Sequence, residues 1–261
     1  MSTVRSADHT TIAYETAGSG PGVVLVDGAT CFRDSGPMRA ISELLAPSAT
    51  VVMYDRRGRG ESGDTPPYAL EREIEDIAAL IDAVGAPVSL FGMSSGGALA
   101  LESAVALGPE RVNRLAVYEP PFVPEEALPS AAAYTRELSE ALAADDRDRA
   151  VELFLKRVGV PVTAIDTMRR SPGWASLVGI APTLAYDDAA LGDSAVPIEL
   201  AGAVRVPLLA LGGGASPAFL RYGAEALAAA VPDGDCAILE GQTHDVSADA
   251  IAPVLARFAM A

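Results

Sequence analysis

The chain has 261 residues, half of them hydrophobic, and a formal net charge of −16 at pH 7. This length fits a single α/β domain with a large buried core. The negative charge opposes contact with nucleic-acid phosphates and with anionic membranes, so we expect neither as a partner. We expect a small-molecule substrate and a protein that is a monomer or a homodimer.

Targeting signals and metal-site spacings do not stand out in the sequence. Residues 1–8 lack the apolar stretch of a signal peptide, and no apolar run approaches the roughly 18 residues that a membrane helix needs. The two cysteines, Cys31 and Cys236, suit neither a disulfide framework nor a metal site, and there are only two histidines. We therefore expect a cytoplasmic protein without a metal centre.

Short apolar runs alternate with amphipathic stretches along most of the chain. An antiparallel edge hairpin is expected around Arg5 and Thr11–Tyr14, and the other expected strands are Val23–Val26, Val51–Tyr54, Val88–Phe91, Leu115–Tyr118, Leu208–Leu211 and Ala237–Leu239. Their continuous apolar character is typical of parallel strands that are covered on both faces. Helices are expected over 69–84, from a cap at Ser216-Pro217 to Ala230, and after a cap at Ser247. This order predicts an α/β fold with a doubly wound, mostly parallel sheet.

Residues 124–197 interrupt this alternation. Three stretches, 131–144, 147–158 and 174–186, have helical patterns, and no strand pattern lies between them. The segment is too long for a loop. We expect a helical cap, inserted between core segments 1–123 and 198–261, over the carboxyl edge of the sheet where ligands bind in such folds.

The strongest chemical signal is Gly92-Met-Ser94-Ser-Gly96, which follows an expected strand and precedes the helical stretch 97–107. In this context a serine lies on a tight strand-to-helix turn, and the flanking glycines relieve crowding there. The hydroxyl is then exposed beside a helix N-terminus, where developing negative charge is favoured. Ser94 is therefore the expected nucleophile.

A second signal is Gly241-Gln-Thr-His244, after the last expected strand and before the last helix. A serine hydroxyl is a weak nucleophile at neutral pH and needs an adjacent base. Of the two histidines, His9 belongs to the expected edge hairpin, whereas His244 has the C-terminal position of the base in the order serine, acid, histidine. His244 is therefore the expected general base.

Together these features resemble the α/β-hydrolase superfamily, most closely its small, capped, esterase-like bacterial members. The resemblance covers essentially the whole chain and rests on the motifs Gly92–Gly96, Asp55-Arg-Arg-Gly-Arg-Gly-Glu-Ser62, Tyr118-Glu-Pro-Pro121, Val206-Pro207 and Gly241–His244. It implies hydrolysis of a carboxylic ester, thioester or lactone without a cofactor. It also argues against the haloalkane dehalogenases of the superfamily, which need a carboxylate where Ser94 stands.

The sequence departs from the family pattern at the catalytic acid. Most members carry an aspartate after the strand that follows the cap, where this chain reads Leu211-Gly-Gly-Gly-Ala215. Some relatives place the acid one strand earlier, and that position is Glu119 here. We expect Glu119 to orient His244, because an unoriented histidine is a poor base. The alternatives are that Glu119 organises its own loop and that the adjacent Asp245 is the acid.

A second departure is Asp27, which stands where the family usually has the histidine of a His-Gly pair. The resemblance places the oxyanion hole at the backbone amides of Ala29 and Ser95. A carboxylate next to that hole repels a developing oxyanion unless it is neutralised. We expect an ion pair of Asp27 with Arg56 or Arg57. The alternative is a direct role of Asp27 as a general acid or as a substrate contact.

Substrate contacts are expected from the cap and from the loop after Asp27. The candidates share an apolar or aromatic side chain, and they are Cys31, Phe32, Phe154, Met168, Trp174, Leu177 and Tyr186. As a group they favour a mostly apolar pocket. Two other functions stay open: a lyase or cyclase that uses His244 and Asp27, and a ligand receptor without catalysis.

Overall fold

The computed structural model describes residues 2–260 and places an eight-stranded sheet at the centre, with strand order β1-β2-β4-β3-β5-β6-β7-β8. The strands are β1 (Ser2–Arg5), β2 (Thr11–Ala17), β3 (Gly22–Val26), β4 (Thr50–Tyr54), β5 (Val88–Met93), β6 (Val112–Tyr118), β7 (Leu208–Gly213) and β8 (Gly234–Leu239). β1 and β2 pair antiparallel, as do β2 and β4, and all other pairs are parallel. The expected strands, the edge hairpin and the mostly parallel sheet are confirmed.

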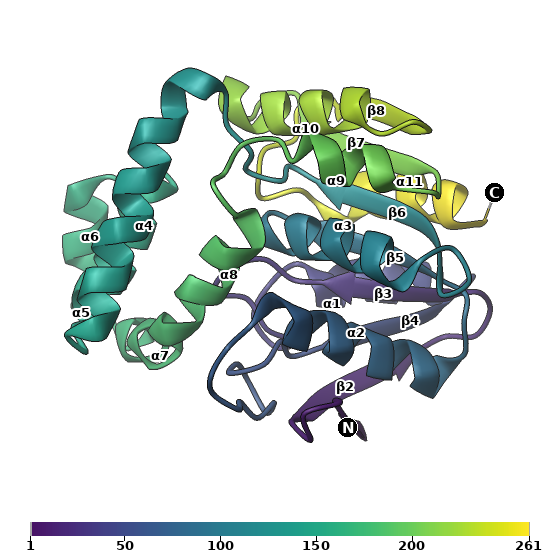
Figure 1. Ribbon diagram of the computed structural model, residues 1–261, viewed down its shortest axis with the longest axis horizontal. Helices are drawn as coiled ribbons and strands as arrows, with labels where there is room; N and C mark the ends of the chain where they lie inside the picture. The colour runs from purple at the N-terminus through teal and green to yellow at the C-terminus, as the bar shows by residue number, and fades with distance from the viewer. Residues whose placement is uncertain (1, 261) are drawn as a thin grey trace.

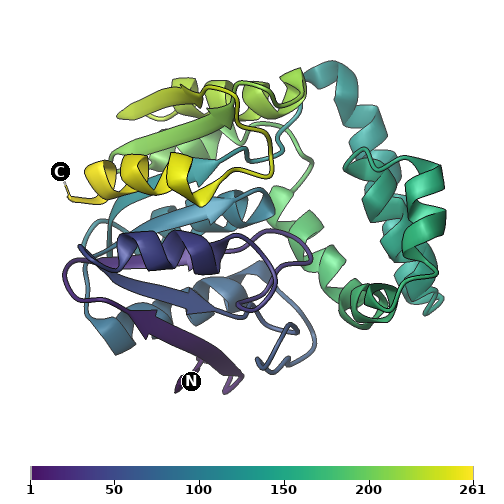
Figure 2. The ribbon, with the colours of Figure 1, turned by 180° about the vertical axis from the view of Figure 1, so that it is seen from behind.

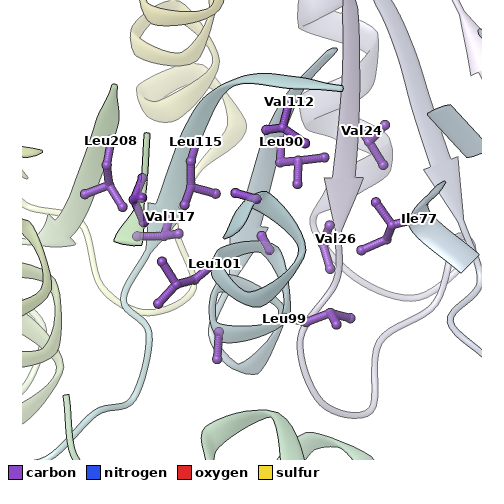
Figure 3. Close-up of a cluster of buried hydrophobic side chains, with 14 of the residues drawn as sticks. Val24, Val26, Ile77, Leu90, Leu99, Leu101, Val112, Leu115, Val117 and Leu208 are labelled. Carbon is purple, nitrogen blue, oxygen red and sulfur yellow. The ribbon is translucent and has the colours of Figure 1, made fainter. Parts of the chain in front are cut away.

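Helices cover both faces of this sheet (Figures 1 and 2). One layer contains α1 (Met38–Leu45) and α11 (Ala248–Met260), and the other contains α2 (Leu70–Val84), α3 (Ser95–Leu107), α9 (Ile198–Ala203) and α10 (Ala218–Ala230). The apolar run of β3 serves both layers, because successive side chains of a strand point to opposite faces. Val23 and Leu25 pack with α1 and α11, whereas Val24 and Val26 pack with α2 and α3. Figure 3 shows side chains of the cluster on the α2 and α3 side of the sheet, with Leu99 and Leu101 of α3 among them.

Two expected helix caps have different outcomes. Ser247 caps α11 as expected, since its Oγ accepts a hydrogen bond from the Ala250 N–H at 3.3 Å. The expected cap at Ser216 is wrong by one residue. Pro217 has extended backbone angles and occupies the N-cap position itself, so that α10 begins at Ala218.

Residues 125–191, between β6 and α9, form a group of helices beyond one end of the sheet (Figure 1). It contains a short 3-10 turn at Glu125–Ala127, then α4 (Leu128–Ala143), α5 (Arg147–Arg157), α6 (Val162–Met168), α7 (Gly173–Ile180), a second 3-10 turn at Ala181–Thr183, and α8 (Leu184–Leu191). The helix expected over 174–186 is therefore two helices, and the break contains Pro182, which lacks a backbone N–H. We call α4 to α8 the cap. It has an apolar core of its own, and its last helix, α8, packs against α3.

Candidate active site

Ser94 lies on the turn between β5 and α3, in a backbone conformation that is strained for a residue with a side chain. Its φ is 55° and its ψ is −130°. The Ser94 N–H donates to the Tyr118 carbonyl at 2.9 Å, which fixes the turn to the neighbouring strand β6. A Cβ atom at Gly92 would lie 2.2 Å from the Gly96 carbonyl oxygen, so the turn can close only with glycine there. This is the geometry expected of a nucleophile elbow, and the Ser94 side chain is partly exposed.

Glu119 follows β6 directly and is fully buried, with its carboxylate directed at His244. Glu119 Oε2 is 2.8 Å from His244 Nδ1, and Oε1 accepts a hydrogen bond from the Gly213 N–H at 2.7 Å. Burial opposes ionisation, but the hydrogen bonds from His244 and Gly213 outweigh it and keep the pKa of Glu119 below its usual value. The carboxylate is therefore anionic at neutral pH and holds the proton of His244 on Nδ1. In the neutral imidazole this arrangement leaves the lone pair on Nε2, where a general base needs it.

The loop after β7 packs directly against the loop that carries His244. A Cβ atom at Gly213 would lie 2.4 Å from the Gln242 carbonyl oxygen. Backbone bonds from Gly214 to Leu239 and from Ala215 to Gln242 hold the two loops together at 2.8 and 2.9 Å. The histidine loop thus leaves no space for a side chain at Gly213. Asp245 is exposed and forms no hydrogen bond with His244 in the part of the chain that the structure describes.

Separate hydrogen bonds hold Ser94 and His244 at the carboxyl end of β6. The Ser94 N–H binds the Tyr118 carbonyl, while the Tyr118 hydroxyl donates to the Thr243 carbonyl at 2.5 Å and the adjacent Glu119 binds His244. Within residues 2–260 no hydrogen bond joins Ser94 Oγ to His244. Catalytic hydrogen bonds are often long in unliganded enzymes and tighten when substrate binds.

The backbone N–H groups of Ala29 and Ser95 have no acceptor in residues 2–260. Ser95 is the first residue of α3. A Cβ atom at Gly28 would lie 3.0 Å from Ser94 Cβ, so the loop with Ala29 runs directly against Ser94. Two free N–H groups beside a serine on an elbow are the arrangement that stabilises a tetrahedral oxyanion.

Asp27 is buried without the expected ion pair, so that expectation is wrong. Arg56 bonds to Asp27 only at its backbone carbonyl, at 3.2 Å, and not at its carboxylate. Arg57 binds Asp76 and Asp8 instead. Asp27 is 3% exposed, and its Oδ1 has no hydrogen-bond partner among the described residues. Burial raises the pKa of Asp27 to about 7, although the nearby Arg59 and Arg56 act in the opposite direction. Near neutral pH the carboxyl group is therefore partly protonated.

Replacing Asp27 by asparagine should make the pH dependence of stability shallower. The pKa rises from 3.8 to about 7 on folding, so the folded protein keeps a proton that the unfolded chain releases, and stability falls as the pH rises through this interval. Between pH 5 and pH 8 this loss amounts to roughly 2 to 3 kcal/mol in the wild type. Urea unfolding of both proteins at pH 5 and pH 8 measures their free energies of unfolding. The difference between Asp27→Asn and the wild type should shift by that amount in favour of the variant when the pH is raised from 5 to 8. An equal difference at both pH values would contradict the raised pKa.

Three buried arginines of the motif Asp55–Ser62 hold the loops around the site. Arg57 pairs with Asp76, whereas Arg56 Nη1 and Arg59 Nη2 both bind Asp187 of α8, at 2.6 and 2.5 Å. Asp187 also accepts a hydrogen bond from Ser95 Oγ at 2.8 Å. Sequence reasoning missed Asp187. The available signal was the density of arginines in this motif, since buried arginines require carboxylate partners.

The expected cap contacts fall into two groups. Trp174 lies in the cap core, where its Nε1–H donates to Asp148 at 2.6 Å, and Tyr186 stacks on Tyr68 with ring centroids 3.9 Å apart. Both therefore have structural contacts that account for them. Phe154, Met168 and Leu177 are only partly buried at the edge of the cap core, and Ala29 packs against the same cluster. Cys31 and Phe32, next to this loop, are also partly buried, and burial raises the pKa of the Cys31 thiol to about 12.

Residues 18–257 match the model of the Alpha/beta hydrolase family. The chain belongs to this family. An alpha/beta hydrolase from Sphaerobacter thermophilus has a solved structure that is 46% identical, with a TM-score of 0.87 over 98% of this chain and 99% of that chain. An esterase from Thermogutta terrifontis, 22% identical with a TM-score of 0.68 over 98% and 96% of the two chains, shares the fold.

A curated relative of this hydrolase is "Putative carbamate hydrolase RutD" from Azorhizobium caulinodans. It is 34% identical over 106 residues, which are 40% of this chain and 39% of the relative. The hydrolase thus aligns with about two fifths of that relative's length. No helix in residues 2–260 of the hydrolase combines the length and apolarity needed to cross a bilayer.

Proposed function

We propose that this hydrolase cleaves a carboxylic ester, thioester or lactone of a small, mostly apolar metabolite through an acyl-enzyme on Ser94. The observation that carries the proposal is the buried Glu119 carboxylate, 2.8 Å from His244 Nδ1, at the strand end that also fixes the Ser94 elbow. Such a pair costs stability to bury, and its use is to orient and charge-stabilise a histidine base.

In the proposed reaction, His244 Nε2 takes the proton of Ser94 Oγ as the oxygen attacks the substrate carbonyl. The oxyanion accepts hydrogen bonds from the amides of Ala29 and Ser95, and Glu119 stabilises the imidazolium. His244 then gives its proton to the leaving oxygen or sulfur, and the acyl group stays on Ser94. A water molecule, deprotonated by His244, attacks the acyl-enzyme; the bond between the acyl carbon and Ser94 Oγ breaks, Oγ takes the proton back from His244, and the acid is released.

The apolar character of the substrate is inferred from what surrounds Ala29. This residue packs against the cap cluster, and the partly buried Phe154, Met168 and Leu177 belong to the same cluster. An acyl or ring group bound at Ser94 would displace water from such side chains. We propose these three residues, with Cys31 and Phe32, as the ones that contact it.

A second candidate function is a non-hydrolytic lyase or cyclase on the same scaffold. The observation in its favour is Oδ1 of Asp27, which has no hydrogen-bond partner within residues 2–260 and lies two residues before Ala29. In that case Asp27 or His244 exchanges a proton with a bound metabolite, and Ser94 only donates a hydrogen bond.

Turnover in ¹⁸O-labelled water separates the two functions. Aryl acetates, butyrates and phenylacetates, their thioesters and γ-lactones would be incubated with the wild type and, as the control, with the Ser94→Ala variant. We expect one solvent oxygen in every acid that the wild type releases, because water attacks the acyl-enzyme. Substrate conversion by the wild type without solvent oxygen in the product, or no turnover above the Ser94→Ala control, would contradict the proposed hydrolysis.

A further inference from the structure

Asp187 lies on cap helix α8 but is buried in the core, directly behind the loops of the proposed oxyanion hole. Its Oδ1 accepts hydrogen bonds from Ser95 Oγ at 2.8 Å and from Arg56 Nη1 at 2.6 Å, and its Oδ2 accepts one from Arg59 Nη2 at 2.5 Å. The two guanidinium groups overcome the effect of burial and keep the pKa of Asp187 below its usual value. The carboxylate is therefore an anion with three donors.

The bonds of Asp187 extend to both backbone segments that carry the free amides. One path is direct, since the Ser95 side chain binds Asp187. The other path runs through Arg59, whose Nη1 donates to the Gly28 carbonyl at 2.7 Å, one residue before Ala29. Arg56 adds a bond to the carbonyl of Asp27 at 3.2 Å. One carboxylate of the cap thus connects two loops that come from different strands of the core.

We propose that Asp187 is a positioning residue that sets the spacing between the Ala29 and Ser95 amides, so that the oxyanion hole is formed correctly only when α8 of the cap is seated on the core. The inference rests on the proposed acyl transfer at Ser94.

Charge neutralisation alone does not account for this arrangement. Arg56 already has a bidentate carboxylate partner in Glu73, at 2.8 Å for both bonds, and Asp187 is the carboxylate that neutralises Arg59. The bonds to Ser95 Oγ and to the Gly28 carbonyl add no charge compensation, but each fixes the backbone beside a free amide. Displacements of about 1 Å in such donors can lower a rate about 100-fold.

The test compares Asp187→Asn with Asp188→Asn. Asp188 is the next residue on α8, is partly buried, and makes no ion pair with Arg56 or Arg59 in the described part of the chain. Both substitutions remove the same charge from the same helix. For hydrolysis of p-nitrophenyl acetate we expect Asp187→Asn to lower kcat about 100-fold with KM changed less than about threefold. Asp188→Asn should leave both constants near the wild-type values.

A second readout does not require activity. In ¹⁵N-labelled protein, Asp187→Asn should shift the backbone amide resonances of both Ala29 and Ser95, and Asp188→Asn should shift neither. Should the wild type lack esterase activity, the proposed function fails, and these resonances alone decide the role of Asp187. Unmoved Ala29 and Ser95 resonances in Asp187→Asn would overturn the inference, as would equal kcat values for the two variants of an active enzyme.

Asp187→Asn leaves two buried arginines with less negative charge and can fail to fold. Ser95→Ala keeps every charge and removes only the bond between Ser95 Oγ and Asp187. We expect this variant to lower kcat about tenfold at unchanged KM and to shift the Ala29 resonance, because Asp187 then loses one of its three donors. Wild-type kcat together with an unmoved Ala29 resonance would overturn the inference.

Discussion

Exchange of Glu119 for glutamine should lower kcat for the esters that the wild type cleaves by about 10⁴-fold, with little change in KM. The amide oxygen of glutamine can still accept the hydrogen bond from the Gly213 N–H. Its NH₂ group then faces His244 Nδ1 and favours the tautomer that carries the proton on Nε2. That tautomer cannot take the proton of Ser94. Steady-state kinetics on the folded variant measures the effect.

The matched control for this exchange is Asp245→Asn, which removes the carboxylate adjacent to His244 in the sequence. Asp245 is exposed and is not bonded to His244, so its loss should change kcat less than about twofold. A large loss in Asp245→Asn together with an active Glu119→Gln variant would assign the acid to Asp245 and reject Glu119.

Replacement of Ser94 by alanine should lower kcat by about 10⁶-fold, because no other group in the proposed mechanism can form the acyl-enzyme. We expect this loss of activity to be visible in kcat and not in KM. The control is Ser103→Ala on the same helix, α3, where the buried hydroxyl has no hydrogen-bond partner among the described residues. Its kcat should equal that of the wild type. A Ser94→Ala variant that retains more than about a hundredth of the activity would contradict nucleophilic catalysis by Ser94.

The parts of the fold and site that the sequence predicts are those with a local pattern. Continuous apolar runs such as Val23–Val26 predict parallel strands, because both faces of such a strand are buried. Gly92–Gly96 predicts the elbow, because only glycine fits beside the turn at Ser94. Glu119 has no local pattern of its own: the family resemblance points to it from its place after β6, and its contact with His244 across 125 positions of the chain fits that expectation. Its catalytic role stays a prediction.

The parts that escape prediction depend on partners far apart in the chain. Arg56 and Asp187 are 131 positions apart, and no periodicity connects them. The ion pair expected for Asp27 failed because Arg56 and Arg57 have closer carboxylates, Glu73 and Asp76, on α2. Which acid an arginine selects is decided by tertiary packing.

The aromatic residues of the cap show the same limit. Pocket residues and core residues on a helix have the same spacing in the sequence. The pattern alone therefore could not decide which of the two Trp174 and Tyr186 are. The structure places the first in the cap core and the second against Tyr68.

The most direct test of the account is covalent labelling with a fluorophosphonate probe, followed by mass spectrometry of the modified peptide. The account predicts one adduct per chain, on Ser94, formed by the wild type and by Asp245→Asn and lost or strongly slowed in His244→Ala and Glu119→Gln. No adduct in the folded wild type, an adduct on another residue, or equal labelling rates in Glu119→Gln and the wild type would contradict a Ser94 nucleophile activated by the His244–Glu119 pair.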